Sequence, residues 1–201
     1  ISAPLEEIIA SGDASGQMRQ NLRIIDKNRE RLSTLVNQLL DFRKIDSRKH
    51  IAMRQEIDLK KLLSDIYERF LKTSYTKHIE MLFELPEGDA SVISDSDALI
   101  KITDNLLANA LKFTSDRILL QLQRNADRSF TIRVTDNGKG IPDRLKKLIF
   151  DPFYQIDKQD EKRGYGIGLS LVKNLSEVLE GQIRVSDAPG GGTVFSEIGR
   201  A

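Results

Sequence analysis

From about residue 51 to the C-terminus, strand-like and helix-like segments alternate, and this alternation restricts the fold more than any other feature. Apolar residues at intervals of three or four predict helices that run from the cap Asp58 to about Leu71, at 96–113, near 143–149 and at 167–180. The intervening runs predict strands at 51–57, 79–85, 117–124, 130–136, 182–187 and 193–198. This order predicts an α/β fold, a two-layer sandwich in which a mixed sheet is backed by three main helices.

Residues 1–50 follow a different pattern. The sequence from Gln17 to His50 has no Gly or Pro. Apolar residues recur there at spacings of three, four and seven: Leu22, Ile25, Leu32, Leu35, Val36, Leu39 and Phe42. One amphipathic helix at about 17–46 is predicted, and its apolar stripe needs another helix to cover it. A shorter helix at 1–10 and a turn at 11–16 precede it, so we expect a helical hairpin at 1–50 and a second domain at 51–201.

The composition excludes several classes of protein. The 201 residues include 31 Lys and Arg against 30 Asp and Glu, a balance that argues against a nucleic-acid binder with a basic surface. There is no cysteine, which excludes a disulfide scaffold, a Cys-ligated metal site and a thiol nucleophile. The longest stretches without charge, 164–172 and 188–196, are too short to cross a bilayer. We expect a soluble, globular, intracellular protein, and Ile1 in place of Met indicates a piece of a longer chain.

A polar stripe lies along the predicted helix at 96–113. At about 100° per residue, Lys101, Asn105, Asn109 and Lys112 fall within a narrow arc. A solvent-facing polar surface is one interpretation. Because Asn is a mediocre helix former, the other interpretation is a neutral oxygen ligand for a hard cation beside a phosphate-binding ammonium group.

The segment Asp136-Asn137-Gly138-Lys139-Gly140 directly follows a predicted strand. Asn-Gly favours an ordinary turn, which is the simplest interpretation. Alternatively, the two glycines allow the backbone to approach a flat ligand closely, because no Cβ stands in the way. A carboxylate at a strand end can accept a hydrogen bond from an exocyclic amine such as that of adenine.

Two further segments surround a polar stretch at 157–163. Gly164, Gly166 and Gly168 open the predicted helix at 167–180, so backbone N–H groups and the positive end of the helix dipole are available to a phosphate. No strand immediately precedes these glycines and no Gly-Lys-Ser/Thr follows, which excludes the dinucleotide-binding motif and the P-loop. Phe150-Asp151-Pro152-Phe153 reads either as an aromatic anchor or as the start of a lid that orders around a ligand.

Taken in order, these segments resemble a known family. The blocks are Asn105…Asn109…Lys112-Phe113-Thr114, Asp136-x-Gly-x-Gly, Phe150-x-Pro-Phe, Gly164-x-Gly-x-Gly-Leu and Gly190-Gly-Gly-Thr193-x-Phe195. They resemble the N, G1, F, G2 and G3 boxes of the catalytic, ATP-binding domain of sensor histidine kinases. That domain is a member of the ATPase group that includes Hsp90, gyrase B and MutL.

The resemblance implies roles for individual residues. Asn109 would bind Mg²⁺ with Asn105 beside it, Lys112 would reach the phosphates, and Asp136 would bind adenine. The other residues implied to contact nucleotide or support its binding are Phe113, Gly138, Gly140, Gly164, Tyr165, Gly166, Ile167, Gly168, Leu169 and Thr193. Tyr165 departs from the family, which more often has a small hydroxyl residue there.

The resemblance also implies the reaction. Asn105 stands where ATP-hydrolysing relatives have a glutamate base, and an amide cannot take a proton from water, so transfer of the γ-phosphate to a histidine is expected. Neither His50 nor His78 lies in a segment like the family's acceptor, so residues 1–50 are expected to be a truncated dimerisation hairpin without it.

Several partners follow from the same resemblance. They are ATP with Mg²⁺, the histidine-bearing dimerisation helix of the parent kinase and a response-regulator receiver domain, with a homodimer in the parent and no nucleic acid. The parent is expected to be anchored in a membrane, with this portion in the cytoplasm. A non-catalytic nucleotide-binding or dimerisation module of the same fold is the alternative.

Overall fold

The computed structural model divides the chain into two compact units, Ile1–Arg43 and Lys44–Ala201. In the first unit it describes residues 18, 20–26, 28–29, 32–33, 36 and 40, and in the second 53–126, 129–156 and 165–199. Every described residue of the first unit is helical, as predicted for 17–46. Ile25, Leu32 and Val36 of the predicted stripe are exposed. Residues 1–17 and 41–52 lie outside the described residues, so the hairpin and the domain boundary at 50 stay predictions.

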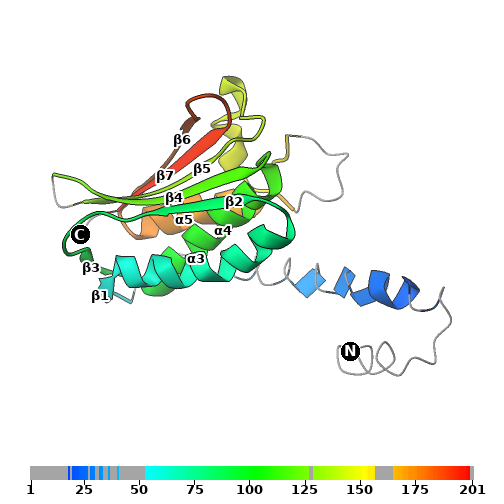
Figure 1. Ribbon diagram of the computed structural model, residues 1–201, viewed down its shortest axis with the longest axis horizontal. Coiled ribbons are helices and arrows are strands. Elements are labelled where there is room, and N and C mark those ends of the chain that lie inside the picture. The colour runs from blue at the N-terminus through cyan, green and yellow to red at the C-terminus, as the bar shows by residue number, and fades with distance from the viewer. Residues whose placement is uncertain are drawn as a thin grey trace. The chain divides into compact units, whose positions relative to one another are not determined.

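The second unit contains a sheet with helices on one face, as Figure 1 shows. Three α-helices were predicted and are found at α3 (Leu59–Thr76), α4 (Ser96–Phe113) and α5 (Gly168–Val178). The strands are β1 (Gln55–Asp58), β2 (Glu80–Glu84), β3 (Ser91–Ser94), β4 (Arg117–Arg124), β5 (Phe130–Asp136), β6 (Gln182–Asp187) and β7 (Thr193–Gly199). The short helix predicted near 143–149 is found as two short 3-10 helices, Asp143–Leu145 and Leu148–Phe150.

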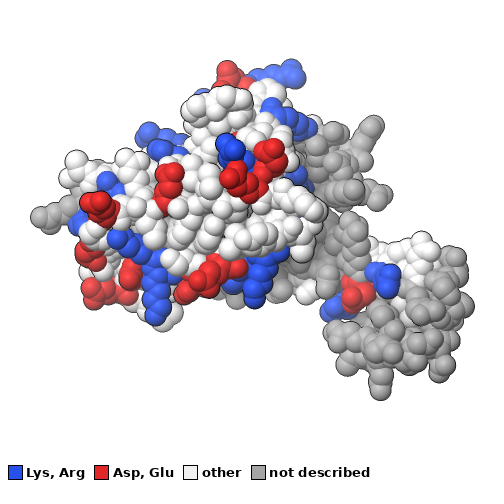
Figure 2. All heavy atoms as spheres, viewed as in Figure 1, with Lys and Arg blue, Asp and Glu red and all other residues white. Residues whose placement is uncertain are grey.

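The five-stranded sheet has the order β2-β4-β5-β7-β6. Strands β2 and β4 are parallel and the other neighbours are antiparallel, which confirms the predicted mixed sheet. Strands β1 and β3 form a separate antiparallel pair that the sequence pattern did not predict. On the face drawn in Figure 2, basic and acidic side chains of the described residues lie interspersed.

Helix α4 forms the centre of the core. Asp95 caps it by accepting a hydrogen bond from the Ala98 amide at 3.1 Å. Its apolar face is inaccessible to solvent, with 0 % exposure at Leu99, Ile102, Leu106 and Leu107. This face packs on the sheet, so the opposite polar face carrying the two asparagines is held at a fixed place in the fold.

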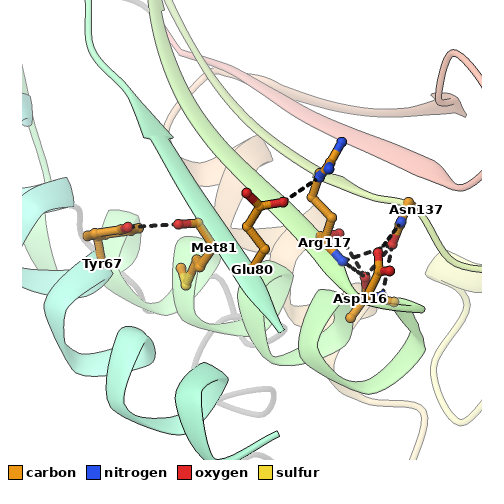
Figure 3. Close-up of polar contacts among 7 residues, drawn as sticks. Tyr67, Glu80, Met81, Asp116, Arg117 and Asn137 are labelled. Carbon is orange, nitrogen blue, oxygen red and sulfur yellow. Dashed lines mark hydrogen bonds and ion pairs between the residues drawn. The ribbon is translucent and has the colours of Figure 1, made fainter. Parts of the chain in front are cut away.

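Helix α3 is joined to the edge of the sheet. The Asp58 side chain caps it, accepting from the amides of Lys60 and Lys61, as predicted. Tyr67 stacks on Phe83 of β2 with 4.8 Å between ring centroids. The Tyr67 hydroxyl donates to the Met81 carbonyl at 2.9 Å (Figure 3). Helix α3 ends at Thr76, five residues beyond the predicted end.

A carboxyl group is buried between β7 and α5. Glu197 has 0 % exposure, and its Oε2 lies 2.5 Å from the hydroxyl of Ser176. Among the described residues its Oε1 has no hydrogen-bond partner. Burial therefore raises the pKa of Glu197 to about 7, well above its ordinary value of 4.5.

This buried carboxyl predicts a pH-dependent stability. The folded protein favours the neutral form of the Glu197 carboxyl. The contribution of this carboxyl to the free energy of unfolding is therefore complete below pH 4.5 and is lost as the pH rises to about 7. We expect the difference in unfolding free energy between wild type and Glu197→Gln to fall by about 3 kcal/mol from about pH 4 to about pH 8. Denaturant unfolding of both proteins across this range measures it. Parallel pH profiles would show that Glu197 ionises normally.

Candidate functional site

The polar face of α4 meets the start of α5. The Asn105 side chain donates to the Lys101 carbonyl at 2.7 Å, which fixes the amide on the helix. Its Oδ1 is directed at Gly168, the first residue of α5, where an added Cβ would come within 2.7 Å of it. Asn105 and Gly168, 63 positions apart in sequence, therefore lie against each other.

Further along this face, Asn109 and Lys112 are half-buried. Within the described part of the chain the Asn109 side chain makes no hydrogen bond, so its oxygen is available to a ligand. The Lys112 ammonium lies 5.2 Å from the ring centre of Phe113. The Phe113 ring itself is 37 % exposed.

Asp136 lies at the end of β5 and is 5 % exposed. Its Oδ1 accepts from the Gly138 amide at 2.9 Å, and the backbone and hydroxyl of Thr193 also hydrogen-bond to the carboxyl group. Burial raises the pKa of Asp136, and these hydrogen bonds partly oppose the shift. The result is a buried acceptor at a strand end, held by Gly138 of the loop after β5 and by Thr193 of β7.

The backbone at Gly138 lies directly against the C-terminal end of α4. A Cβ at this position would lie 2.0 Å from the Phe113 carbonyl oxygen and 2.9 Å from Asp136 Oδ1. Only glycine allows so close an approach of the two backbones. Gly140 lies against the Gly192 carbonyl, which places the loop after β5 beside the loop before β7.

The glycines before α5 meet the loop after residue 150. The Phe153 amide donates to the Gly166 carbonyl at 2.9 Å, and a Cβ on Gly166 would lie 2.6 Å from the Tyr154 carbonyl oxygen. Ile167 is buried and Leu169 half-buried, so both support the start of α5, while the Tyr165 ring is 37 % exposed. Gly164 and residues 157–163 of the predicted lid lie outside the described residues.

Phe150 confirms the aromatic-anchor interpretation. Its ring packs edge to face against Phe195 of β7, with ring centroids 6.4 Å apart. All five sequence blocks are therefore joined by direct contacts. The pairs are Phe113 with Gly138, Asn105 with Gly168, Asp136 with Thr193, Gly166 with Phe153, and Phe150 with Phe195.

Sequence reasoning missed one residue at this site. Asn137 was interpreted as part of a turn, yet its side chain bonds to the segment that connects α4 to β4. Nothing local in the sequence signals this contact, because the segment lies 20 or more positions away.

Among the described residues, no three His, Cys, Asp or Glu side chains are grouped in a way that could hold a metal ion. No helix in the described part of the chain is long and apolar enough to cross a membrane.

Comparison with known proteins gives consistent matches. Residues 94–198 match the family described as histidine kinase-, DNA gyrase B-, and HSP90-like ATPase. The sensor histidine kinase TmoS of Ectopseudomonas mendocina is 36 % identical over 200 residues, which are 97 % of this chain and 20 % of TmoS. WalK of Bacillus subtilis is 31 % identical over 180 residues, 87 % of this chain and 29 % of WalK. The chain thus spans less than a third of the length of these relatives.

Solved structures show the same fold. Full-length ShkA in complex with AMPPNP aligns with a TM-score of 0.83 and 24 % identity over 95 % of this chain and 40 % of ShkA. The mycobacterial sensor histidine kinase MprB aligns with a TM-score of 0.63 and 26 % identity over 74 % of this chain and 99 % of the MprB chain.

Proposed function

This chain belongs to the histidine kinase-, DNA gyrase B- and HSP90-like ATPase family, and on that premise we propose that it is the catalytic portion of a sensor histidine kinase. It would bind ATP with Mg²⁺ and transfer the γ-phosphate to a histidine of the parent kinase, for relay to a response-regulator aspartate. The observation that carries this proposal is that the five blocks, spread over about 90 residues of sequence, are joined to one another by direct contacts in the fold.

Asp136 is proposed to recognise the base. Its buried carboxyl can accept a hydrogen bond from the exocyclic amine of adenine, and it would repel the carbonyl group that guanine has at the same place. Gly138 and Gly140 leave the backbone beside it without side chains, so a flat ring can approach. Phe113 supplies an exposed apolar ring close to this loop.

The triphosphate is proposed to lie between α4 and the start of α5. The first backbone N–H groups of α5 have no intrahelical partner, and Ile167 at the cap position makes no side-chain capping bond. This helix end therefore favours a negatively charged group. Lys112 would add a positive charge from α4.

Magnesium is proposed to enter with the nucleotide and to take Asn109 as a ligand. The fit rests on the chemistry of the amide oxygen, since Mg²⁺ prefers neutral and anionic oxygen ligands and usually retains phosphate oxygens and water. The bound cation would neutralise charge on the phosphates. Asn109 itself would orient the complex against the polar face of α4.

Asn105 supports transfer to an external nucleophile. Its amide is bonded to the Lys101 carbonyl and faces Gly168, and it has no basic lone pair with which to activate water. The histidine imidazole would attack the γ-phosphorus while the bond to the β-phosphate oxygen breaks and ADP leaves. Slow ATP hydrolysis is expected without an acceptor.

The remaining parts of the proposal concern the parent protein. Residues 1–50 are proposed to belong to a dimerisation hairpin, and residues 51–201 to form the catalytic domain. A homodimer, a receiver-domain partner and a cytoplasmic location for this portion are proposed for the parent, and the similarity to sensor histidine kinases supports these proposals. His50 and His78 are not proposed as acceptors.

Transfer of labelled phosphate tests the function. The chain is incubated with Mg²⁺, γ-labelled ATP and a separate hairpin that carries the acceptor histidine of a sensor kinase, and a hairpin with that histidine changed to Ala is the control. We expect label on the first hairpin only, and the label should be lost in acid because phosphohistidine is acid-labile. Nucleotide binding without any transfer would favour the non-catalytic module, and label on His50 or His78 would contradict the assignment of the acceptor.

A further inference from the structure

Asn137 separates Asp136 from Gly138, but its side chain bonds away from both, to the segment that joins α4 to β4 (Figure 3). Its Oδ1 accepts from the Thr114 hydroxyl at 2.9 Å, the Asp116 amide at 3.2 Å and the Arg117 amide at 3.0 Å. Its Nδ2 donates to Asp116 Oδ1 at 2.7 Å. One amide side chain thus bonds to two backbone amides and one carboxylate, and it shares the single proton of the Thr114 hydroxyl with the Arg117 carbonyl.

The segment that Asn137 holds, residues 114–117, directly follows the C-terminal end of α4. Thr114 is the C-cap of this helix, and its amide donates to the Ala110 carbonyl. The Thr114 hydroxyl is also 2.7 Å from the Arg117 carbonyl, so the turn is closed on itself. The Asn137 backbone amide adds a bond to the same carbonyl at 3.3 Å.

This network connects the two halves of the proposed nucleotide site. Lys112 and Phe113 immediately precede Thr114 on α4, and Asn109 lies about one turn earlier. Asp136 and Gly138 flank Asn137 on the other side, and Gly138 already touches the Phe113 carbonyl. A shift of Asn137 would therefore change the separation between the base-binding carboxyl and the phosphate-binding end of α4.

We infer that Asn137 is a positioning residue that fixes this separation, an inference that rests on the proposed function. The role requires an amide. Aspartate would keep the acceptor oxygens but would place a second carboxylate against Asp116 in place of the donor. Alanine would remove every side-chain bond and keep only the backbone bond to the Arg117 carbonyl. The neighbouring Arg117 side chain bonds to Glu80 at 2.7 Å.

The inference is tested by a reversal of the donor–acceptor pair. In the double variant Asp116→Asn with Asn137→Asp, the amide at 116 can donate to the carboxylate at 137, which still accepts from Thr114 and the two backbone amides. Asp116→Asn alone keeps an oxygen that can accept from Asn137. Gln121→Ala is the matched control, because it removes another amide–carboxylate bond, to Glu84 at 2.6 Å, on the adjacent strands.

Dissociation constants for Mg·AMP-PNP and for adenosine are measured by titration calorimetry or NMR. Asn137→Asp and Asn137→Ala are expected to lose about tenfold or more in affinity for Mg·AMP-PNP and less than about threefold for adenosine, which contacts only the base side. The double variant, Asp116→Asn and Gln121→Ala are expected to stay within about threefold of wild type. Asn137→Ser, whose single short hydroxyl cannot make all the bonds of the amide, replaces Asn137→Asp if that variant does not fold.

Two results would overturn the inference. Affinities of the Asn137 variants equal to wild type would show that the separation does not depend on this side chain. Equal losses for both ligands, or no recovery in the double variant, would show general loosening of the domain instead of positioning. If the wild-type protein binds neither ligand, the proposed function fails. If the wild-type protein binds and the variants bind equally well, only the inference about Asn137 fails.

Discussion

Asp136→Asn is expected to lower the affinity for Mg·AMP-PNP by about a hundredfold. The carboxyl oxygen proposed to accept from the adenine amine would be replaced by an amide, and an amide NH₂ facing that amine would place donor against donor. Because the amide oxygen can still accept from the Gly138 amide, the loop after β5 is expected to keep its conformation.

The same variant is expected to fold normally. Burial already raises the pKa of Asp136, which means that the site penalises charge, so the neutral amide removes a buried charge and this gain offsets the hydrogen bond from Thr193 that its NH₂ cannot accept. Calorimetric titration at neutral pH measures the affinity, and a thermal melt checks folding. Asp65→Asn, at an exposed position of α3, is the matched control and should bind as wild type does. Undiminished binding by a folded Asp136→Asn protein would remove Asp136 from the site.

Gly138→Ala is expected to lower the stability by about 3 kcal/mol and to abolish measurable nucleotide binding. The added Cβ would lie 2.0 Å from the Phe113 carbonyl oxygen, so either the loop after β5 or the end of α4 must move. Gly138 does not have a positive φ, so the cost comes from lack of space and not from backbone conformation. Movement of either element separates the base-binding and phosphate-binding groups.

Gly88→Ala is the control for this substitution. Gly88 has a φ of 75° and no atom within 4 Å of an added Cβ, so alanine there costs only about 1 kcal/mol of backbone strain. Denaturant unfolding and titration with Mg·AMP-PNP are measured for both variants. We expect both to lose stability and only Gly138→Ala to lose binding. A Gly138→Ala protein with normal stability and affinity would mean that the loop and α4 are not in contact.

Local signals in the sequence predicted most of the helices and strands of the second unit. The bounds of α4 agree with those predicted because Asp95 caps the first turn and the apolar repeat continues to Phe113. The end of α3 was missed because no Gly or Pro marks it. The chain leaves the helix at Lys77 and His78, where His78 adopts a φ of 57°.

Features that depend on distant contacts were not predictable. Strand β3 has four residues and forms only by pairing with β1, more than 30 positions earlier. The parallel pairing of β2 with β4 likewise depends on the path of α4 between them. The motifs predicted residues that the fold brings together, but the side-chain bonds of Asn137 are made to a turn that lies 20 or more positions away in sequence.

Glu197 was missed although a local signal was present. In a strand over 193–198, Thr193, Phe195 and Glu197 share one face. Because Phe195 is an aromatic residue that favours burial, its face of the strand is expected to be buried, and Glu197 with it. The hydroxyl that bonds to it comes from Ser176 on α5, which no pattern in the strand could indicate.

The most direct test is a titration of the wild-type chain with Mg·AMP-PNP, followed by calorimetry and by backbone NMR. The account predicts one bound nucleotide per chain, a dissociation constant between about 1 μM and about 1 mM, and amide shifts concentrated at Asn109, Gly138 and Gly168. A folded protein that gives neither heat nor shifts at these positions at millimolar nucleotide would contradict it.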